Sequence, residues 1–136
     1  MNLETLRLLF DFGLLVLIWL VQLVIYPSFR FYQQDNLVKW HRKYTVGIAL
    51  VVIPLMFVQL TTAILQLLEF QNTLTIGSLV LIALVWAITF LQFVPMHRKI
   101  SDEKADKILL TRLVKRNWWR TLLWSVIFIL TLLSSL

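Results

Sequence analysis

The chain has only two histidines, His41 in "KWHRKY" and His97 in "VPMHRK", and each lies at the edge of a long apolar run. Histidine titrates near neutral pH and binds metals and haem, so the two rings could act as an acid/base pair or a ligand pair. One begins a predicted helix and the other ends one, so both can lie at the same end of a bundle. The alternative is that each faces lipid headgroups, with His97 favoured by the dipole of its helix.

Metal and cofactor chemistry has little support in the sequence. Neither histidine belongs to a spacing such as H-x-x-x-H or H-E-x-x-H, and the chain has no cysteine. Haem held by His41 and His97 is a minor alternative, because the two rings would have to face each other within the bilayer and they lie at its edge. We therefore expect no metal. The sequence does not identify a cofactor, and the expectation is that the protein has none.

Apolar runs decide the fold class. The 136 residues are 60% hydrophobic, whereas soluble domains usually reach about 45–50%. A helix needs about 20 apolar residues to cross a bilayer, and the runs are continuous rather than alternating, which excludes a barrel pattern. The predicted spans are about 10–26, 44–68, 74–94 and 118–133. The sequence predicts one all-α domain over 1–136, an integral membrane four-helix bundle with up-down-up-down topology.

The basic residues predict an orientation. Of 13 lysines and arginines, 12 fall on the side of the first and third connections, and only Arg7 lies with the termini. The positive-inside rule makes the connection side cytoplasmic. We therefore expect a multi-pass protein of the bacterial inner membrane with both termini on the non-cytoplasmic side. Topology accounts for the charge excess and no nucleic-acid module is present, so we expect no nucleic acid as a partner.

Helical extensions are expected beyond the cytoplasmic face, over about 34–43 and 102–117. Ser101 is followed by two acidic residues, which is typical of a helix start. Asp35 or Asn36 is expected to cap the second helix in the same way.

The first and third helices end alike. "WLVQLVIYPSFR" (19–30) and "WAITFLQFVPMHR" (86–98) share a tryptophan, a later glutamine and Pro-x-x-Arg, and Pro27 and Pro95 lie 68 residues apart. This echo suggests a tandem duplication of one helical hairpin, although interfacial aromatic and basic residues alone would give a similar pattern. Pro27 and Pro95 are expected to end helices, and Pro54 is expected to kink the second helix.

A candidate site follows from this topology, because its residues all approach one end of the bundle. Either histidine would be the acid/base, an arginine would hold an anionic or carbonyl oxygen, two tryptophans would stack on a ring, and two glutamines would line the floor. Alternatively, the glutamines bond between helices and the aromatic residues form an interfacial belt. The catalytic candidates are His41 and His97, and the ligand-binding candidates are Gln22, Tyr26, Trp40, Gln92, Arg98, Asn117, Trp118 and Arg120.

Three segments, "VIYPSF", "VPMHRKI" and "RLVKRNWWRTLLW", resemble the small four-helix membrane proteins of the anthrone oxygenase-like family. Members with an assigned activity are similar to cofactor-independent oxygenases acting on polycyclic anthrones, which is the activity that the resemblance implies. Pro95-Met96-His97 departs from the Pro-x-Asn often found after the third helix. By resemblance, the recurrent polar positions are His97, Arg98, Asn117, Trp118 and Arg120.

Two functions remain open on the sequence. The first is a pocket on the cytoplasmic side that binds a quinone-like or lipid-like small molecule, in an oxidoreductase or oxygenase. The second is a non-catalytic structural or accessory subunit of a larger membrane complex. Membrane lipid is the expected partner in both, and a homo-oligomer is an alternative assembly.

Overall fold

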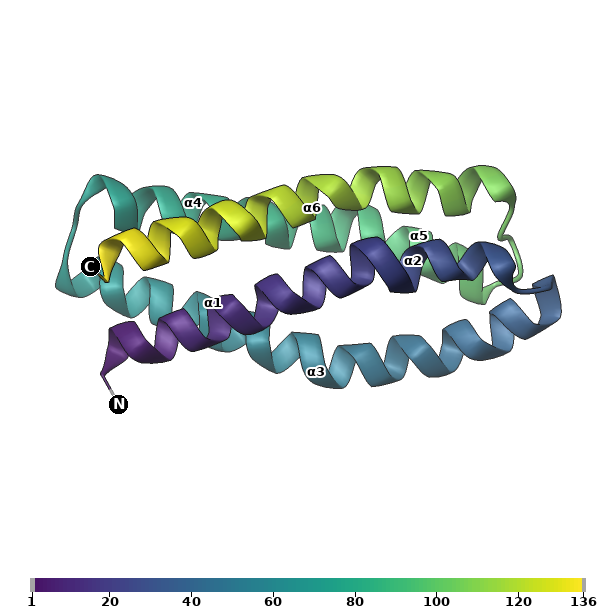
Figure 1. Cartoon of the computed structure of the whole chain (residues 1–136), viewed down its shortest axis with the longest axis horizontal. Helices are drawn as coiled ribbons and strands as arrows, with labels where there is room; N and C mark the ends of the chain where they lie inside the picture. The colour runs from purple at the N-terminus through teal and green to yellow at the C-terminus, as the bar shows by residue number, and fades with distance from the viewer. Residues whose placement is uncertain (1, 136) are drawn as a thin grey trace.

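The computed structural model describes residues 2–135 and consists of four long helical segments that run antiparallel in an up-down-up-down bundle (Figure 1). Both termini lie at the same end, as the topology predicts. Within residues 2–135 there are no strands. The all-α four-helix bundle is thus confirmed. Its elements are α1 (Leu3–Leu20), η1 (Val21–Ile25), α2 (Tyr26–Ser28), η2 (Phe29–Phe31), α3 (Gln34–Glu69), α4 (Thr73–Ile88), η3 (Thr89–Phe93), α5 (Val94–Ser101) and α6 (Lys107–Ser134).

The core lies along the bundle axis, where α1 packs against α3 and α6, and α4 packs against the same two helices. Leu14, Ile82, Trp124 and Ile127 are buried there, whereas many large apolar side chains face outward. Such an outer surface suits a bilayer, which offers apolar side chains an apolar solvent.

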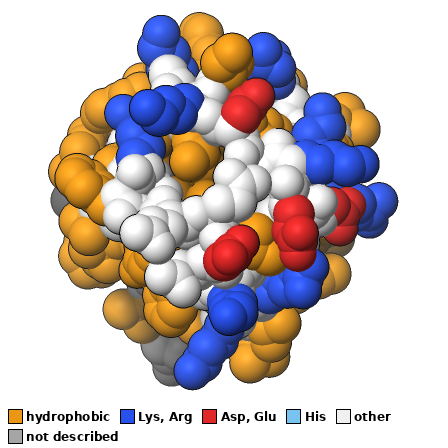
Figure 2. All heavy atoms as spheres, turned by 90° about the vertical axis from the view of Figure 1, so that its right-hand side faces the viewer, with side chains coloured by type: hydrophobic (Ala, Val, Ile, Leu, Met, Phe, Trp, Pro, Cys, Tyr) orange, Lys and Arg blue, Asp and Glu red, His pale blue; other side chains and the backbone are white. Residues whose placement is uncertain are grey.

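Within the described residues, three helical segments are long and apolar enough to cross a membrane: Leu3–Phe31, Gln34–Glu69 and Thr73–Ser101. The fourth predicted span, 118–133, lies in α6 and is not among them. Asn117 and Arg120 lower the hydropathy of that helix. Seen end-on in Figure 2, the end of the bundle that carries the first and third connections is surrounded by lysine and arginine side chains.

Pro27 and Pro95 do not end helices as predicted, because the chain stays helical through both. A π-turn precedes each proline: the Tyr26 N–H donates to the Val21 carbonyl in η1, and the Val94 N–H donates to the Thr89 carbonyl in η3. The wider turn accommodates a residue that lacks an N–H. The two π-turns are 68 residues apart, as the prolines are, so the echo between the two halves extends to the backbone.

The predicted helix start at 102 is wrong. Because α5 continues past its proline as far as Ser101, the chain has to reverse within 102–106, and Glu103 there has a left-handed φ of 62°. The fourth helix begins at Lys107, where the carboxylate of Asp106 accepts the Leu109 N–H at 2.6 Å.

Residues 34–43 are helical as predicted, since α3 begins at Gln34. Its N-cap is Gln33, which makes no side-chain capping bond, so neither Asp35 nor Asn36 caps this helix. Pro54 lies inside α3 without interrupting it, and the helix is visibly bent in its middle (Figure 1).

Candidate binding site between the helices

The structure brings the two histidines into direct contact. His41 Nε2 lies 2.8 Å from His97 Nδ1, and the two rings are nearly parallel with centroids 5.0 Å apart. Each ring uses its second nitrogen as well: His41 Nδ1 lies 3.0 Å from the Ser101 hydroxyl, and His97 Nε2 lies 2.9 Å from the Tyr26 hydroxyl. The result is an unbroken chain of four side chains, Ser101–His41–His97–Tyr26, drawn from α2, α3 and α5.

Aromatic rings pack against these four hydrogen-bonded side chains and fix their positions. Phe29 is buried edge-on against His41 at 5.5 Å and against Tyr44 at 5.4 Å between centroids. Tyr44 in turn lies 6.4 Å from the His97 ring. The alternative in which the histidines face lipid headgroups on separate surfaces does not fit this packing, since His41 is fully buried.

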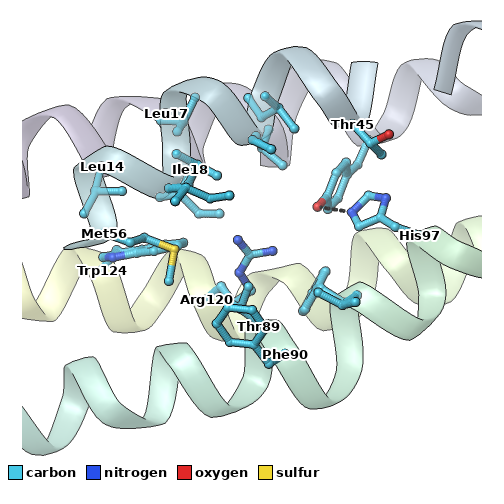
Figure 3. A pocket seen from close by; sticks show the side chains of 18 of the residues that line it. Leu14, Leu17, Ile18, Thr45, Met56, Thr89, Phe90, His97, Arg120 and Trp124 are labelled. Carbon is cyan, nitrogen blue, oxygen red and sulfur yellow. Dashed lines mark hydrogen bonds between the residues drawn. The ribbon is translucent and has the colours of Figure 1, made fainter. Parts of the chain in front are cut away.

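A cavity of about 300 Å³ adjoins His97 (Figure 3). It lies between α1, α3, α6 and the η3–α5 segment, and its volume falls within the range of small-molecule sites. Most of its wall is aliphatic or aromatic. The ionisable side chains on the wall are Tyr26, Tyr44, His97 and Arg120.

Of the residues that the structure describes, Arg120 is the one strong cation on the cavity wall, and only 7% of its surface is exposed. Its guanidinium carbon lies 4.3 Å from the centroid of Phe93 and 5.1 Å from that of Trp124, so two aromatic rings stabilise the charge. Figure 3 shows the group pointing into the space between the helices. Among the described residues, Arg120 Nε has no hydrogen-bond partner. A buried donor without a partner is costly, so the site is suited to an acceptor that a ligand supplies.

The rim of the cavity is apolar and lies on the side of the bundle. Ile53 from α3, Phe90 from η3 and Val94 from α5 line the cavity and are 49%, 54% and 40% exposed. These side chains mark an opening between α3 and the η3–α5 segment. In a membrane, this opening would face lipid rather than water.

Of the ten predicted site residues, three line the cavity, namely Tyr26, His97 and Arg120, and His41 lies behind His97 and bonds to it. Gln22 and Asn117 are buried beside it and bond to each other, with the Asn117 amide donating to Gln22 Oε1 at 2.9 Å. They act between helices, which was the alternative for glutamines in the spans.

The other four predicted residues do not line the cavity, and they are Trp40, Gln92, Arg98 and Trp118. Trp40, Arg98 and Trp118 are exposed, because each directly neighbours an inward-facing residue and so points to another side of its helix. The Trp118 ring packs edge-on against Trp19 at 5.8 Å instead.

Besides Tyr26, the aromatic residues that line the cavity are Tyr44, Phe90, Phe93 and Trp124, which the sequence reasoning did not select. Helical spacing was an available signal. Phe93 lies four residues before His97 and Trp124 lies four residues after Arg120, so each pair shares one helix face.

A second polar cluster, in the half of the bundle near the termini, was also missed. Arg7 was expected with the termini, yet both Arg7 and Asp11 are buried, and Arg7 Nε donates to Asp11 Oδ2 at 2.7 Å. The remaining donors of Arg7 reach Gln66 Oε1 at 3.0 Å and the Ser78 hydroxyl at 2.6 Å.

Asp11 is equally well bonded. The Gln59 amide donates to Asp11 Oδ1 at 2.6 Å and the Thr131 hydroxyl to Oδ2 at 2.5 Å. Trp124 donates its indole N–H to Gln59 Oε1 at 3.2 Å. This Arg7–Asp11 cluster therefore joins α1, α3, α4 and α6. The i, i+4 spacing of opposite charges on one helix was the signal that could have found it.

The chain matches no protein-family model, no curated protein and no solved structure. In the part of the chain that the structure describes, no three His, Cys, Asp or Glu side chains come together as a metal site would require.

Proposed function

We propose that this membrane protein binds a flat, largely apolar molecule with a ring carbonyl, such as a quinone or a cyclic aryl ketone, in the cavity beside His97. One observation carries the proposal: Arg120, buried and with an unpartnered Nε, shares a small apolar cavity with the Tyr26–His97 hydrogen bond. Apolar walls with a few convergent polar groups are typical of ligand sites.

The orientation proposed for the protein follows the distribution of basic residues. The end with the first and third connections lies in the cytoplasm of a bacterium, and both termini lie on the other side of the inner membrane. The cavity then lies in the cytoplasmic half of the bilayer. A lipid-soluble ligand reaches it sideways, through the opening between Ile53 and Phe90, without entering water.

The proposed chemistry is proton removal from the ligand followed by oxidation. With anthrone, Tyr26 and His97 accept a proton from the ring CH₂ group, and the negative charge moves to the ketone oxygen beside Arg120. A guanidinium stabilises such an oxyanion more in the transition state than in the ketone. The enolate then reacts with O₂, and anthrone plus O₂ gives anthraquinone plus water. This is the cofactor-independent activity that the sequence resemblance implies.

Binding is the direct test. Purified protein in lipid nanodiscs is titrated with anthrone without oxygen and, separately, with a short-chain ubiquinone, and quenching of tryptophan fluorescence is followed. Arg120→Leu is expected to weaken binding by about 10- to 100-fold, the effect of losing a hydrogen bond to a charged group. Arg116→Ala, on an exposed position one turn earlier, is the matched control and should bind normally.

Failure of both probes to bind the wild-type protein would overturn the proposal. The non-catalytic subunit would then be the better interpretation, and the mass of the protein extracted with its native lipids would show whether it belongs to a larger complex or a homo-oligomer.

A further inference from the structure

The Ser101–His41–His97–Tyr26 chain extends farther than a binding site needs. Only Tyr26 and His97 line the cavity, whereas His41 and Ser101 lead away from it. Ser101 is the last residue of α5 and is partly exposed, at the end of the bundle where lysines and arginines gather (Figure 2). These four hydrogen-bonded side chains therefore connect the cavity to the basic end of the bundle.

Every member of this chain can both give and accept a proton. When Tyr26 donates to His97 Nε2, His97 Nδ1–H donates to His41, and His41 Nδ1–H donates to Ser101. When all bonds are reversed, the Ser101 hydroxyl donates to His41 Nδ1, His41 Nε2–H donates to His97 Nδ1, and His97 Nε2–H donates to the Tyr26 oxygen. Both arrangements use neutral imidazoles and leave no nitrogen of the pair unpaired, so either one is chemically complete.

We propose that these four side chains are a proton route between the cavity and water at the basic end of the bundle. This inference rests on the proposed function, because the proton that moves along the route comes from the bound ligand. His41 and Ser101 do not touch the ligand, so they are relay and positioning residues rather than catalytic ones.

The transfer balances at each bond. The ligand C–H bond breaks and an O–H bond forms on Tyr26, whose original proton passes to His97 Nε2. His97 Nδ1 loses its proton to His41 Nε2, and His41 Nδ1 loses its proton to Ser101. The Ser101 hydroxyl releases its own proton to water. One proton leaves the cavity, nothing is oxidised or reduced, and the electron pair remains on the ligand beside Arg120.

Two further contacts fit such a route. The guanidinium of Arg42 donates two hydrogen bonds to the Ser101 carbonyl, at 3.1 and 2.8 Å, and thereby fixes the outer end of the chain against α3. Arg120 and Tyr44 are the other ionisable groups on the cavity wall near His97. The cation of Arg120 disfavours an imidazolium there, so a transfer in which both rings stay neutral before and after is preferred.

The ligand-free protein gives the first test, because only two histidines have to be assigned. In ¹⁵N-histidine-labelled protein in nanodiscs, exchange of the His97 ring N–H with D₂O is followed by NMR. His41→Gln keeps a polar side chain of similar length but cannot pass a proton on, and it is expected to slow this exchange by about 100-fold. Exchange as fast as in the wild type would overturn the route.

Ser101 provides a second variant in case His41→Gln does not fold. Ser101→Ala is expected to slow exchange in the same direction, and Ser101→Thr, which keeps the hydroxyl, is expected to restore it. Ser28→Ala is the control, since that hydroxyl bonds only to the Ile25 carbonyl at 2.7 Å among the described contacts. A structural role alone would make the alanine and threonine variants of Ser101 alike, and that result would contradict the inference.

The ligand step is tested separately with anthrone in D₂O without oxygen, where deuterium uptake at the CH₂ group reports proton transfer alone. His41→Gln is expected to bind anthrone normally and to lose the catalysed uptake. Normal binding with undiminished uptake counts against the relay, whereas no binding by the wild type counts against the proposed function, and the NMR experiment still decides on the route.

Discussion

The two buried polar clusters differ in one respect, which is how completely their atoms are bonded. Around Arg7 and Asp11, the guanidinium and both carboxylate oxygens have partners from all four long helices, within 2.5–3.0 Å. Around Arg120, aromatic rings replace hydrogen-bond acceptors, one donor has no partner among the described residues, and a cavity lies alongside. Buried polar groups whose atoms all have hydrogen-bond partners indicate a structural link between helices. A buried polar group that lacks a partner beside a cavity indicates a binding site.

Removing the acid of the Arg7–Asp11 cluster should have the largest effect. Asp11→Ala leaves the Arg7 charge buried without its counter-ion, and a loss of about 3–5 kcal/mol in the free energy of unfolding is expected. Denaturant unfolding in micelles measures it, with Glu4→Ala, an exposed acid on the same helix, as the control. The double variant Arg7→Met/Asp11→Ala should recover most of the loss. Equal stability of Asp11→Ala and Glu4→Ala would show that the cluster is not a structural link.

The same substitution at the two buried arginines sharpens the contrast. Arg7→Leu should destabilise the protein as strongly as Asp11→Ala, because Asp11 then remains buried without its counter-ion. Arg120→Leu removes a group whose Nε has no hydrogen-bond partner among the described residues. Stability should therefore change by no more than about 1 kcal/mol, while ligand binding falls. Thermal melting of both variants in nanodiscs makes the comparison, and a similar melting temperature for the two would refute it.

The smallest effect is expected at the Gln22–Asn117 pair, which lies beyond Arg120 as seen from the Arg7–Asp11 cluster. Asn117→Leu removes an amide that donates to Gln22, and hydrogen bonds between membrane helices average about 0.6 kcal/mol. Lys115→Ala, exposed on the same helix, serves as the reference in the same unfolding assay. A loss above about 2 kcal/mol would show that this pair stabilises the bundle as the Arg7–Asp11 cluster does.

Much of the fold could be predicted because bilayer thickness and loop charge act on long stretches of sequence. The apolar runs and the basic connections predict the bundle and its topology, and topology alone brings His41 and His97 to one end. The ends of helices depend on local backbone geometry. A proline normally breaks a helix, but at Pro27 and Pro95 a preceding π-turn accommodates the residue that lacks an N–H, and the helix continues. Composition does not reveal such a turn.

The site was harder to predict than the fold, because side-chain direction changes by about 100° per residue in a helix. Trp118 and Arg120 are two positions apart, and this is enough to place one outside and the other in the cavity wall. Arg7 was placed with the termini because charges near the start of an apolar run are usually at its boundary. The helix in fact begins at Leu3, and both Arg7 and Asp11 are buried inside the bundle.

The paired π-turns have a consequence for how this protein can vary. A π-turn holds one residue more than an α-helix of the same length, so deleting one residue from Val21–Ile25 would restore a regular helix. Because the π-turn takes up the extra residue locally, the residues on either side of the deletion would keep their helix faces. Tyr26 would stay on the cavity side and Leu14 in the core. Relatives of this protein that lack one residue at this point are therefore expected to keep the cavity, whereas a one-residue deletion in the regular part of α1 would rotate the two parts of the helix by about 100° relative to each other.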